Sequence, residues 1–209
     1  MLRRAFLGVA LTAAAPVFAQ GNLQSSAVSM VEDAGRQMVA LINDPATGPE
    51  QKREKAATLL RNFVDLRGVS RFVLGRFART ADPGALRDFQ ATFEEWIVRN
   101  LAARFGELAG VTFQVARTLP RDDGAVEVQT LVAQGGKQPA VLGWRVENVG
   151  NAPKIVDLVA EGSSLRQTTR SEYSSFLSQN GGDLSKLTAR LRQQLAALVD
   201  QQTRVTAGR

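Results

Sequence analysis

The chain has 209 residues, of which 44% are hydrophobic and 22% charged; its formal net charge is +6, and it contains neither cysteine nor histidine. This length and composition are ordinary for one soluble globular domain with a sizeable core. The missing cysteine and histidine exclude thiol nucleophiles, the Ser-His-Asp triad and the usual zinc sites.

The N-terminus has the pattern of a secretory signal peptide. Arg3 and Arg4 precede an apolar run over residues 5–15, and Val17 and Ala19 supply the small residues of a cleavage site. The run is shorter than the roughly 20 residues that a membrane-spanning helix needs. We therefore expect cleavage after Ala19 and a periplasmic protein. The arginine pair fits either the general secretory route or the twin-arginine route.

Removal of the signal peptide, residues 1–19, lowers the formal charge from +6 to +4, because it carries two arginines and no acids. This mild positive charge suits contact with an anionic membrane surface or an acidic protein partner. No nucleic-acid-binding motif is present, and a periplasmic location argues against such a partner.

Residues 20–109 are predicted to be helical. The first helix covers residues 24–43, a second begins at Pro49, and a short third covers about 69–78. The strongest helix begins at Asp82-Pro83, and a stripe of apolar residues at steps of three and four continues to Leu108.

The apolar period changes to two in residues 110–162. Four segments alternate between apolar and polar residues, with short turns between them: VTFQVARTL, AVEVQTLVA, AVLGWRVEN and KIVDLVAEG. They predict a four-stranded antiparallel meander with one apolar and one more polar face.

Residues 163–205 return to helical periodicity. Gly181-Gly182 separates two helices, Asp183 caps the second, and the tail from Gln201 is expected to fray. The predicted fold class is α+β, with a four-stranded antiparallel sheet packed against several helices.

The end of the last strand combines acids with serines. Asp157 and Glu161 lie four residues apart, about 13 Å along a strand, whereas the carboxylates of inverting glycosidases are roughly 6.5–9.5 Å apart. Ser163 and Ser164 have no histidine to act as a base. We therefore interpret this cluster as structural and expect Asp157 to form a cross-strand ion pair with Arg145.

Three further stretches stand out, in chain order: VLGRFARTADPGALRDFQATFEEWI, KIVDLVAEGSSL and RSEYSSFLSQNGGDLSKLTARL. In the same order they resemble the xLGxYWxxAxPxQRxxFxxxFxxxL motif, the WxxYDVxxEGVSL signature and the closing motif of the MlaC or toluene-tolerance family of periplasmic phospholipid-binding proteins. The likeness spans about Val64 to Leu195. Pro153 stands where the family usually has Trp, and Leu101 where Tyr is common.

This resemblance implies a monomeric, cone-like fold related to nuclear transport factors, with residues 20–209 as the lipid-binding domain. It implies a shuttle that carries diacyl glycerophospholipid between an outer-membrane lipoprotein complex and an inner-membrane ABC transporter, and so serves outer-membrane maintenance. Catalysis, cofactor and metal are not expected. Three alternatives stay open: a carrier of another lipid such as a hopanoid, a cone-fold enzyme that uses Asp157 as its base, and a protein-binding adaptor.

The expected lipid site lies between the apolar sheet face and the helices, with aromatic residues at its mouth. The candidate lining residues are Phe72, Phe77, Phe93, Trp96, Ile97, Leu101, Phe105, Val126, Val128, Leu142, Trp144, Val146, Val156, Leu158, Tyr173 and Phe176. The same pattern would also suit ordinary core. Arginines near the short third helix and near Arg170 suit either docking and phosphate headgroups or a solvated surface.

Overall fold

Helices precede and follow one antiparallel sheet in the computed structural model, which describes residues 17–207. Most of the predicted signal peptide, residues 1–16, lies outside the described residues. The elements are α1 (Val17–Asn43), α2 (Pro49–Phe63), α3 (Leu66–Leu74), α4 (Phe77–Thr80), α5 (Pro83–Ala103), β1 (Thr112–Pro120), β2 (Val126–Ala133), β3 (Ala140–Val149), β4 (Ala152–Ala160), β5 (Ser163–Ser164), α6 (Leu165–Gln179) and α7 (Leu184–Ala207). The predicted α+β class and meander are confirmed. The two-residue β5 adds a fifth strand beside β4.

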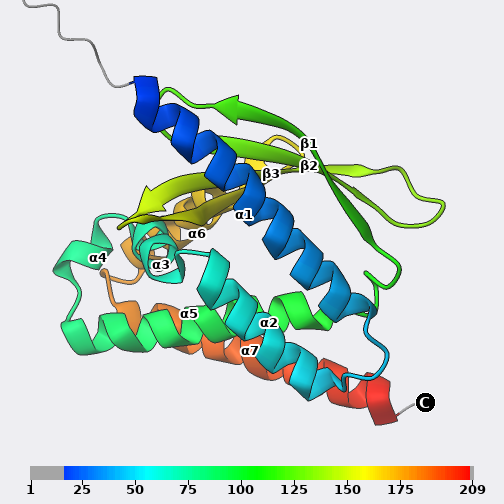
Figure 1. The fold of residues 1–209 in the computed structure, drawn as a ribbon. Helices are drawn as coiled ribbons and strands as arrows, with labels where there is room; N and C mark the ends of the chain where they lie inside the picture. The colour runs from blue at the N-terminus through cyan, green and yellow to red at the C-terminus, as the bar shows by residue number, and fades with distance from the viewer. Residues whose placement is uncertain (1–16, 208–209) are drawn as a thin grey trace, which may run out of the picture.

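The elements form two main layers (Figure 1). The sheet and α1, which crosses one of its faces, make the first layer, and α5 and α7 lie side by side in the second. α2 contacts both α1 and α5, while α3, α4 and α6 gather at one end of the molecule. None of the helices in residues 17–207 is long and apolar enough to span a bilayer.

Helix boundaries differ from the prediction where glycines adopt positive φ angles. Gly75, with φ of 56°, separates α3 from α4, where one continuous helix was predicted. α5 ends at Ala103, and the chain continues in turns to Gly110, although the apolar stripe extended to Leu108. α7 runs to Ala207, so the prediction of a frayed tail from Gln201 was wrong for most of it.

A β-bulge corrects the predicted register of β4. Arg145 pairs with Asp157, but the next residue, Val146, pairs with Ile155, so Val156 is the extra residue. Strict alternation placed Val156 in line with Leu158 on the apolar face. Instead, Ile155 contributes to the buried cluster beneath α1.

α1 approaches the sheet closely because of one glycine. A Cβ atom at Gly35 would lie 2.3 Å from Cε1 of Phe113, far inside van der Waals contact. The Phe113 ring, on β1, therefore packs directly against the α1 backbone. Its centroid lies 6.4 Å from that of the Trp144 ring on β3.

We expect Gly35→Ala to destabilise the protein by about 1–3 kcal/mol, because overpacking outweighs the roughly 1 kcal/mol that alanine adds to helix propensity. Urea unfolding measures the change. In a Phe113→Leu background the same substitution should lose most of its cost. Gly106→Ala, where a Cβ would meet nothing within 4 Å, serves as the control. Equal midpoints for Gly35→Ala and the wild type would contradict the close contact.

Most buried apolar side chains of residues 17–207 belong to one of three separate clusters. The sheet cluster joins Val31 of α1 to Val128, Val146 and Ile155, which lie on β2, β3 and β4. The helical cluster joins α3 to α7 around Phe89 and Leu177. The third, the groove cluster, consists of Leu41, Ile42, Ala56, Phe105 and Val111, with Met38, Val39, Leu59, Leu101, Ala102, Leu108 and Val132 packed against them. The groove cluster contains residues of both layers, because it includes Val132 of β2 and Leu101 of α5.

Candidate ligand-binding site

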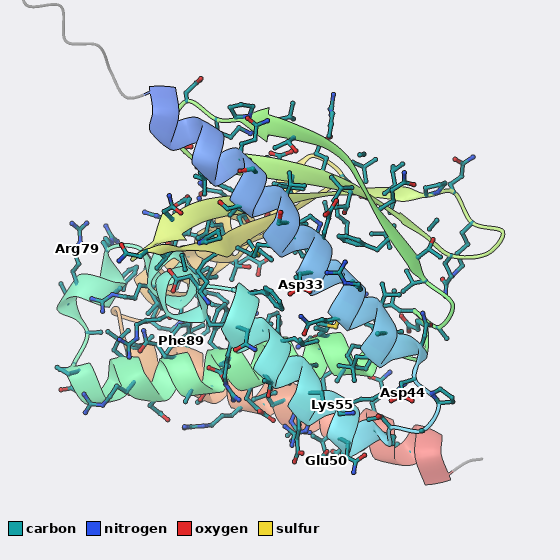
Figure 2. All side chains as sticks on the ribbon, in the orientation of Figure 1. Asp33, Asp44, Glu50, Lys55, Arg79 and Phe89 are labelled. Carbon is teal, nitrogen blue, oxygen red and sulfur yellow. The ribbon has the colours of Figure 1, made fainter. Side chains whose placement is uncertain are left out.

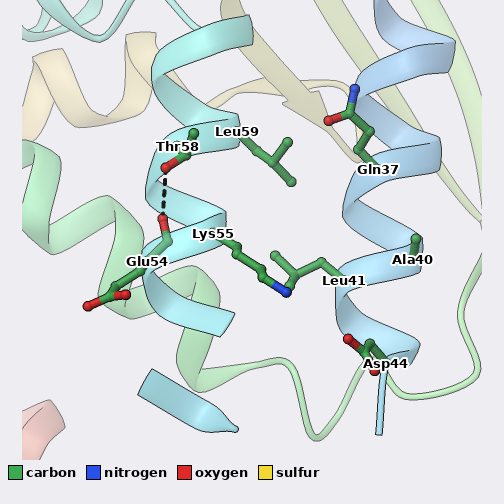
Figure 3. A pocket seen from close by; sticks show the side chains of 8 residues that line it. All are labelled: Gln37, Ala40, Leu41, Asp44, Glu54, Lys55, Thr58 and Leu59. Atoms are coloured by element: carbon green, nitrogen blue, oxygen red, sulfur yellow. Dashed lines mark hydrogen bonds between the residues drawn. The ribbon is translucent and has the colours of Figure 1, made fainter. Parts of the chain in front are cut away.

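A cavity of about 620 Å³ opens between the C-terminal half of α1 and α2 (Figure 3). We call it the α1–α2 groove. Its lining residues are Gln37, Ala40, Leu41, Asp44, Glu54, Lys55, Thr58 and Leu59. The volume lies within the range of about 300–1,000 Å³ that is typical of small-molecule sites.

The floor of the groove is apolar. Leu41 and Leu59 project into the space between the two helices in Figure 3, and both belong to the groove cluster. That cluster also contains Phe105, which follows α5, and Val132, at the end of β2. The floor is therefore continuous with apolar side chains that reach both the sheet and the second layer.

The rim of the groove is polar and carries both charges. Lys55 donates through Nζ to the Thr47 hydroxyl at 3.1 Å, and that hydroxyl donates to Asp44. The hydrogen bond from Thr47, then that from the Ala46 N–H, hold the pKa of the Asp44 carboxyl below its ordinary value. Asp44 is therefore ionised at neutral pH, and the rim offers this acid beside the ammonium of Lys55, joined to it through the Thr47 hydroxyl.

Ion pairs attach the α2 wall of the groove to α5. Arg61 Nε lies 2.6 Å from a Glu94 carboxylate oxygen, and Arg53 lies 3.5 Å from Glu95. On the α1 side, the Lys52 ammonium donates to the Ile42 carbonyl oxygen at 2.7 Å. Polar contacts thus hold α2 both to α5 and to α1.

The predicted lining residues of the sheet divide by burial. Val126, Val128 and Val146 are buried beneath α1, and Trp144 is half-buried beside them, its indole N–H donating to the Thr130 hydroxyl at 2.9 Å.

Val156 is buried, whereas Leu142 and Leu158 are half-buried. All three lie outside the three clusters. Leu142 and Leu158 share the face of Trp144, because Leu142 is two residues from it and Leu158 pairs with it across β3 and β4. The sheet face against α1 therefore keeps partly uncovered apolar side chains.

The predicted residues of the helices fall into two clusters. Leu101 and Phe105 belong to the groove cluster. The helical cluster contains Phe72, Phe77, Phe93, Trp96, Ile97, Tyr173 and Phe176. There Phe93 stacks on Phe89 with ring centroids 5.6 Å apart and meets Tyr173 edge-on, and burial raises the pKa of the Tyr173 hydroxyl. These aromatic residues pack among helices α3 to α7 rather than around the groove.

The residues that line the groove are absent from the predicted set. Leu41 and Leu59 carry a sequence signal, since each lies in an apolar helical stripe. Glu54 and Lys55 come just before Leu59 on the same helix, so charged residues are followed by an apolar one along the groove. The mutual approach of α1 and α2 depends on tertiary contacts and has no sequence motif.

Asp157 has a structural role that differs from the predicted one. Its carboxylate accepts hydrogen bonds from the Ser164 hydroxyl at 2.5 Å and from the Arg166 backbone N–H at 3.0 Å, and lies 3.5 Å from Nε of Arg166. Arg145 faces it across the strands but pairs with Asp123 and Glu147 instead. The predicted Asp157–Arg145 ion pair was therefore wrong, because α6 supplies a closer cation.

Glu161 and Gly162 form the turn between β4 and β5, with φ angles of 53° and 77°. Glu161 is exposed, and Ser164 caps α6 by accepting from the Gln167 N–H. The cluster of acids and serines thus marks a transition from strand to helix. Within residues 17–207, no group of three or more acidic, cysteine or histidine side chains is placed to hold a metal ion.

Comparison with known proteins identifies a solved structure with the same fold and a matching protein family. A phospholipid-binding protein from Ralstonia solanacearum, solved in complex with a phospholipid, superposes with a TM-score of 0.71 at 24% sequence identity, covering 82% of this chain and 97% of that one. The two share the fold. The family model described as MlaC protein matches residues 32–193, from α1 into α7. The chain therefore belongs to the MlaC family.

Proposed function

We propose that the protein is a periplasmic carrier of diacyl glycerophospholipid, with the acyl chains entering through the α1–α2 groove. The observation that carries the proposal is the groove itself, a cavity of about 620 Å³ with an apolar floor and a polar rim. Membership of the MlaC family and the phospholipid found in the Ralstonia protein support the same ligand class. The signal-like N-terminus supports export.

The proposed path for the chains begins at the groove floor and continues along apolar residues, most of which are partly exposed. From Leu41 and Leu59 the groove cluster leads to Leu101 and Val132. Beyond it lies the inner sheet face, where Leu142 and Leu158 keep part of their surface uncovered. Acyl chains placed here would cover side chains that neither layer covers.

Burial energetics favour a ligand with two chains. Each buried methylene contributes about 0.8 kcal/mol, yet a single myristoyl chain gives only a marginal association constant of about 10⁴ M⁻¹ with a membrane. A carrier must hold its ligand through water between two membranes. Two chains provide the burial that this requires, and the headgroup stays at the polar rim beside Lys55.

Asp157, the residue considered as a catalytic base, has a structural role. It is buried and accepts hydrogen bonds that fix the start of α6. We therefore favour a binding protein, which delivers lipid as a monomer between an outer-membrane lipoprotein complex and an inner-membrane ABC transporter. A hopanoid carrier would use the same apolar surfaces, so the ligand must be identified directly.

Native mass spectrometry of the exported protein, followed by lipid analysis of its organic extract, tests the proposal. We expect a discrete mass increment that matches one diacyl phospholipid, because the groove retains its ligand during purification. A polycyclic lipid in the extract would show that the ligand is a hopanoid-like lipid and not a diacyl phospholipid. An apo mass, together with no uptake from labelled phospholipid vesicles, would refute the carrier function and favour an adaptor.

A further inference from the structure

Three arginines from three helices converge on a second cavity, of about 370 Å³, which we call the arginine pocket. Arg71 comes from α3, Arg79 from α4 and Arg170 from α6, and the rest of the lining is Gly68, Phe72, Gly75 and Ala78. In Figure 2, Arg79 lies at the opposite end of the molecule from Lys55 and Asp44. The arginine pocket and the α1–α2 groove are therefore separate sites.

Backbone geometry shapes the arginine pocket. Gly75 has a φ of 56°, which ends α3 and redirects the chain into α4, so that Arg71 and Arg79 border one space. A Cβ at Gly75 would lie 3.3 Å from Nε of Arg170, so the glycine also leaves room for that side chain. The Arg170 guanidinium carbon lies 4.9 Å from the centroid of the Phe72 ring, whose face supports a cation.

The charges of these arginines are not neutralised locally. Among the described residues, Arg71, Arg79 and Arg170 have no carboxylate oxygen within 4.0 Å of their guanidinium nitrogens. Their neighbour Arg166, by contrast, lies within that distance of both Asp157 and Glu147. The pocket is therefore a concentrated positive site without an internal counterion.

Asp65 and Asp82, the carboxylates close in sequence to Arg71 and Arg79, have other roles, and Glu172, two residues from Arg170, is exposed and forms no ion pair with it within 4.0 Å. Asp65 accepts from the Gly68 N–H at the start of α3, and Asp82 accepts from the N–H groups of Gly84 and Ala85 at the start of α5. Both act as helix caps. No carboxylate of the described residues therefore pairs with the three arginines, which leaves the pocket able to bind an anion from another molecule.

We propose that the arginine pocket binds the phosphate of an anionic lipid headgroup exposed at a membrane surface. Guanidinium groups form planar, bidentate hydrogen bonds with phosphate, and three of them border this space. The volume is near the lower end of small-ligand sites, which suits one headgroup better than a helix or strand of a protein partner. The contact would hold the protein at a membrane while the separate α1–α2 groove exchanges lipid, and it goes beyond the proposed carrier function.

Flotation with vesicles of phosphatidylglycerol mixed into phosphatidylcholine tests the proposal. An arginine near an anionic surface contributes roughly fivefold in affinity, so we expect Arg71→Gln/Arg79→Gln/Arg170→Gln to weaken binding about 100-fold. The control Arg104→Gln/Arg117→Gln/Arg204→Gln removes the same charge from the residue after α5, from β1 and from α7, and should weaken binding far less. Circular dichroism checks the fold, and the lipid that copurifies with the pocket variant should be unchanged.

A variant with lysine at the three pocket positions separates a shaped site from a diffuse charge. Lysine keeps the charge but loses the bidentate geometry, so we expect weaker vesicle binding than in the wild type. Wild-type binding by this lysine variant, or equal losses in the control variant, would overturn the proposal. Binding of soluble glycerol phosphate by the wild type, with no binding to vesicles, would also overturn it, because the site would then serve free phosphates. Binding to an acidic protein with no binding to vesicles would also overturn it.

Discussion

Leu59→Glu is expected to leave the purified protein without lipid. Leu59 projects from α2 into the floor of the α1–α2 groove and packs on the groove cluster. A carboxylate at this position would lie against acyl chains, where a charged side chain costs about 3 kcal/mol. Affinity should fall about 100-fold. Native mass spectrometry would measure the fraction of protein that carries lipid.

A matched leucine tests whether the groove itself is responsible. Leu198 is also half-buried, but it lies on α7, away from the groove lining. The Leu198→Glu variant should therefore retain its lipid as long as it folds, even if it is less stable than the wild type. If the Leu59→Glu variant folds and still carries a full complement of lipid, the acyl chains do not bind in the α1–α2 groove. Leu142→Arg extends the test to the sheet, because it changes a half-buried side chain on the face that we propose the chains reach.

Asp157→Ala is expected to lower the free energy of unfolding by about 3–5 kcal/mol, the usual cost of breaking a buried ion pair. The substitution removes the acceptor of the Ser164 hydroxyl and the Arg166 N–H, and it leaves the Arg166 guanidinium buried with less counter-charge. For a domain of this size the melting temperature should fall by about 10 °C. Thermal and urea unfolding would both report it.

The exposed pair Asp88–Arg192 provides the comparison. Both of its side chains are about half exposed, so Asp88→Ala should cost under about 1 kcal/mol. If Asp157→Ala matched Asp88→Ala in stability, the structural role of Asp157 would be wrong. A stable, folded Asp157 variant that lost a measurable turnover would instead revive the enzyme hypothesis.

The sheet and most helices could be predicted because each is determined by a local period. Alternation identified β1 to β4, and the Asp82 cap with Pro83 identified the start of α5. The bulge at Val156 could not be predicted, because a single extra residue changes the pairing without changing the composition. The partner of Asp157 could not be predicted either. Arg166 lies nine residues later in the sequence and reaches Asp157 only because α6 packs against β4.

The predicted lining residues and the lining of the α1–α2 groove are different sets. Apolar residues such as Phe93 and Val128 were expected to line the lipid site, yet Val128 is fully buried under α1 and Phe93 packs within the helical cluster. A filled core and an open cavity have the same periodicity, so burial alone separates them. The groove lining, including Leu59, follows from how far α2 stands from α1, which contacts distant in sequence determine.

The division of the apolar interior into three clusters has a consequence for unfolding. Without ligand, the sheet cluster and the helical cluster share few contacts through which one could stabilise the other, so the apo protein should unfold with low cooperativity. Acyl chains that extend from the groove cluster toward the sheet would connect these parts into one hydrophobic core. Ligand that binds only the folded state also raises its stability by mass action. Delivery of the lipid would then loosen the carrier, and loading would restore a single cooperative unit.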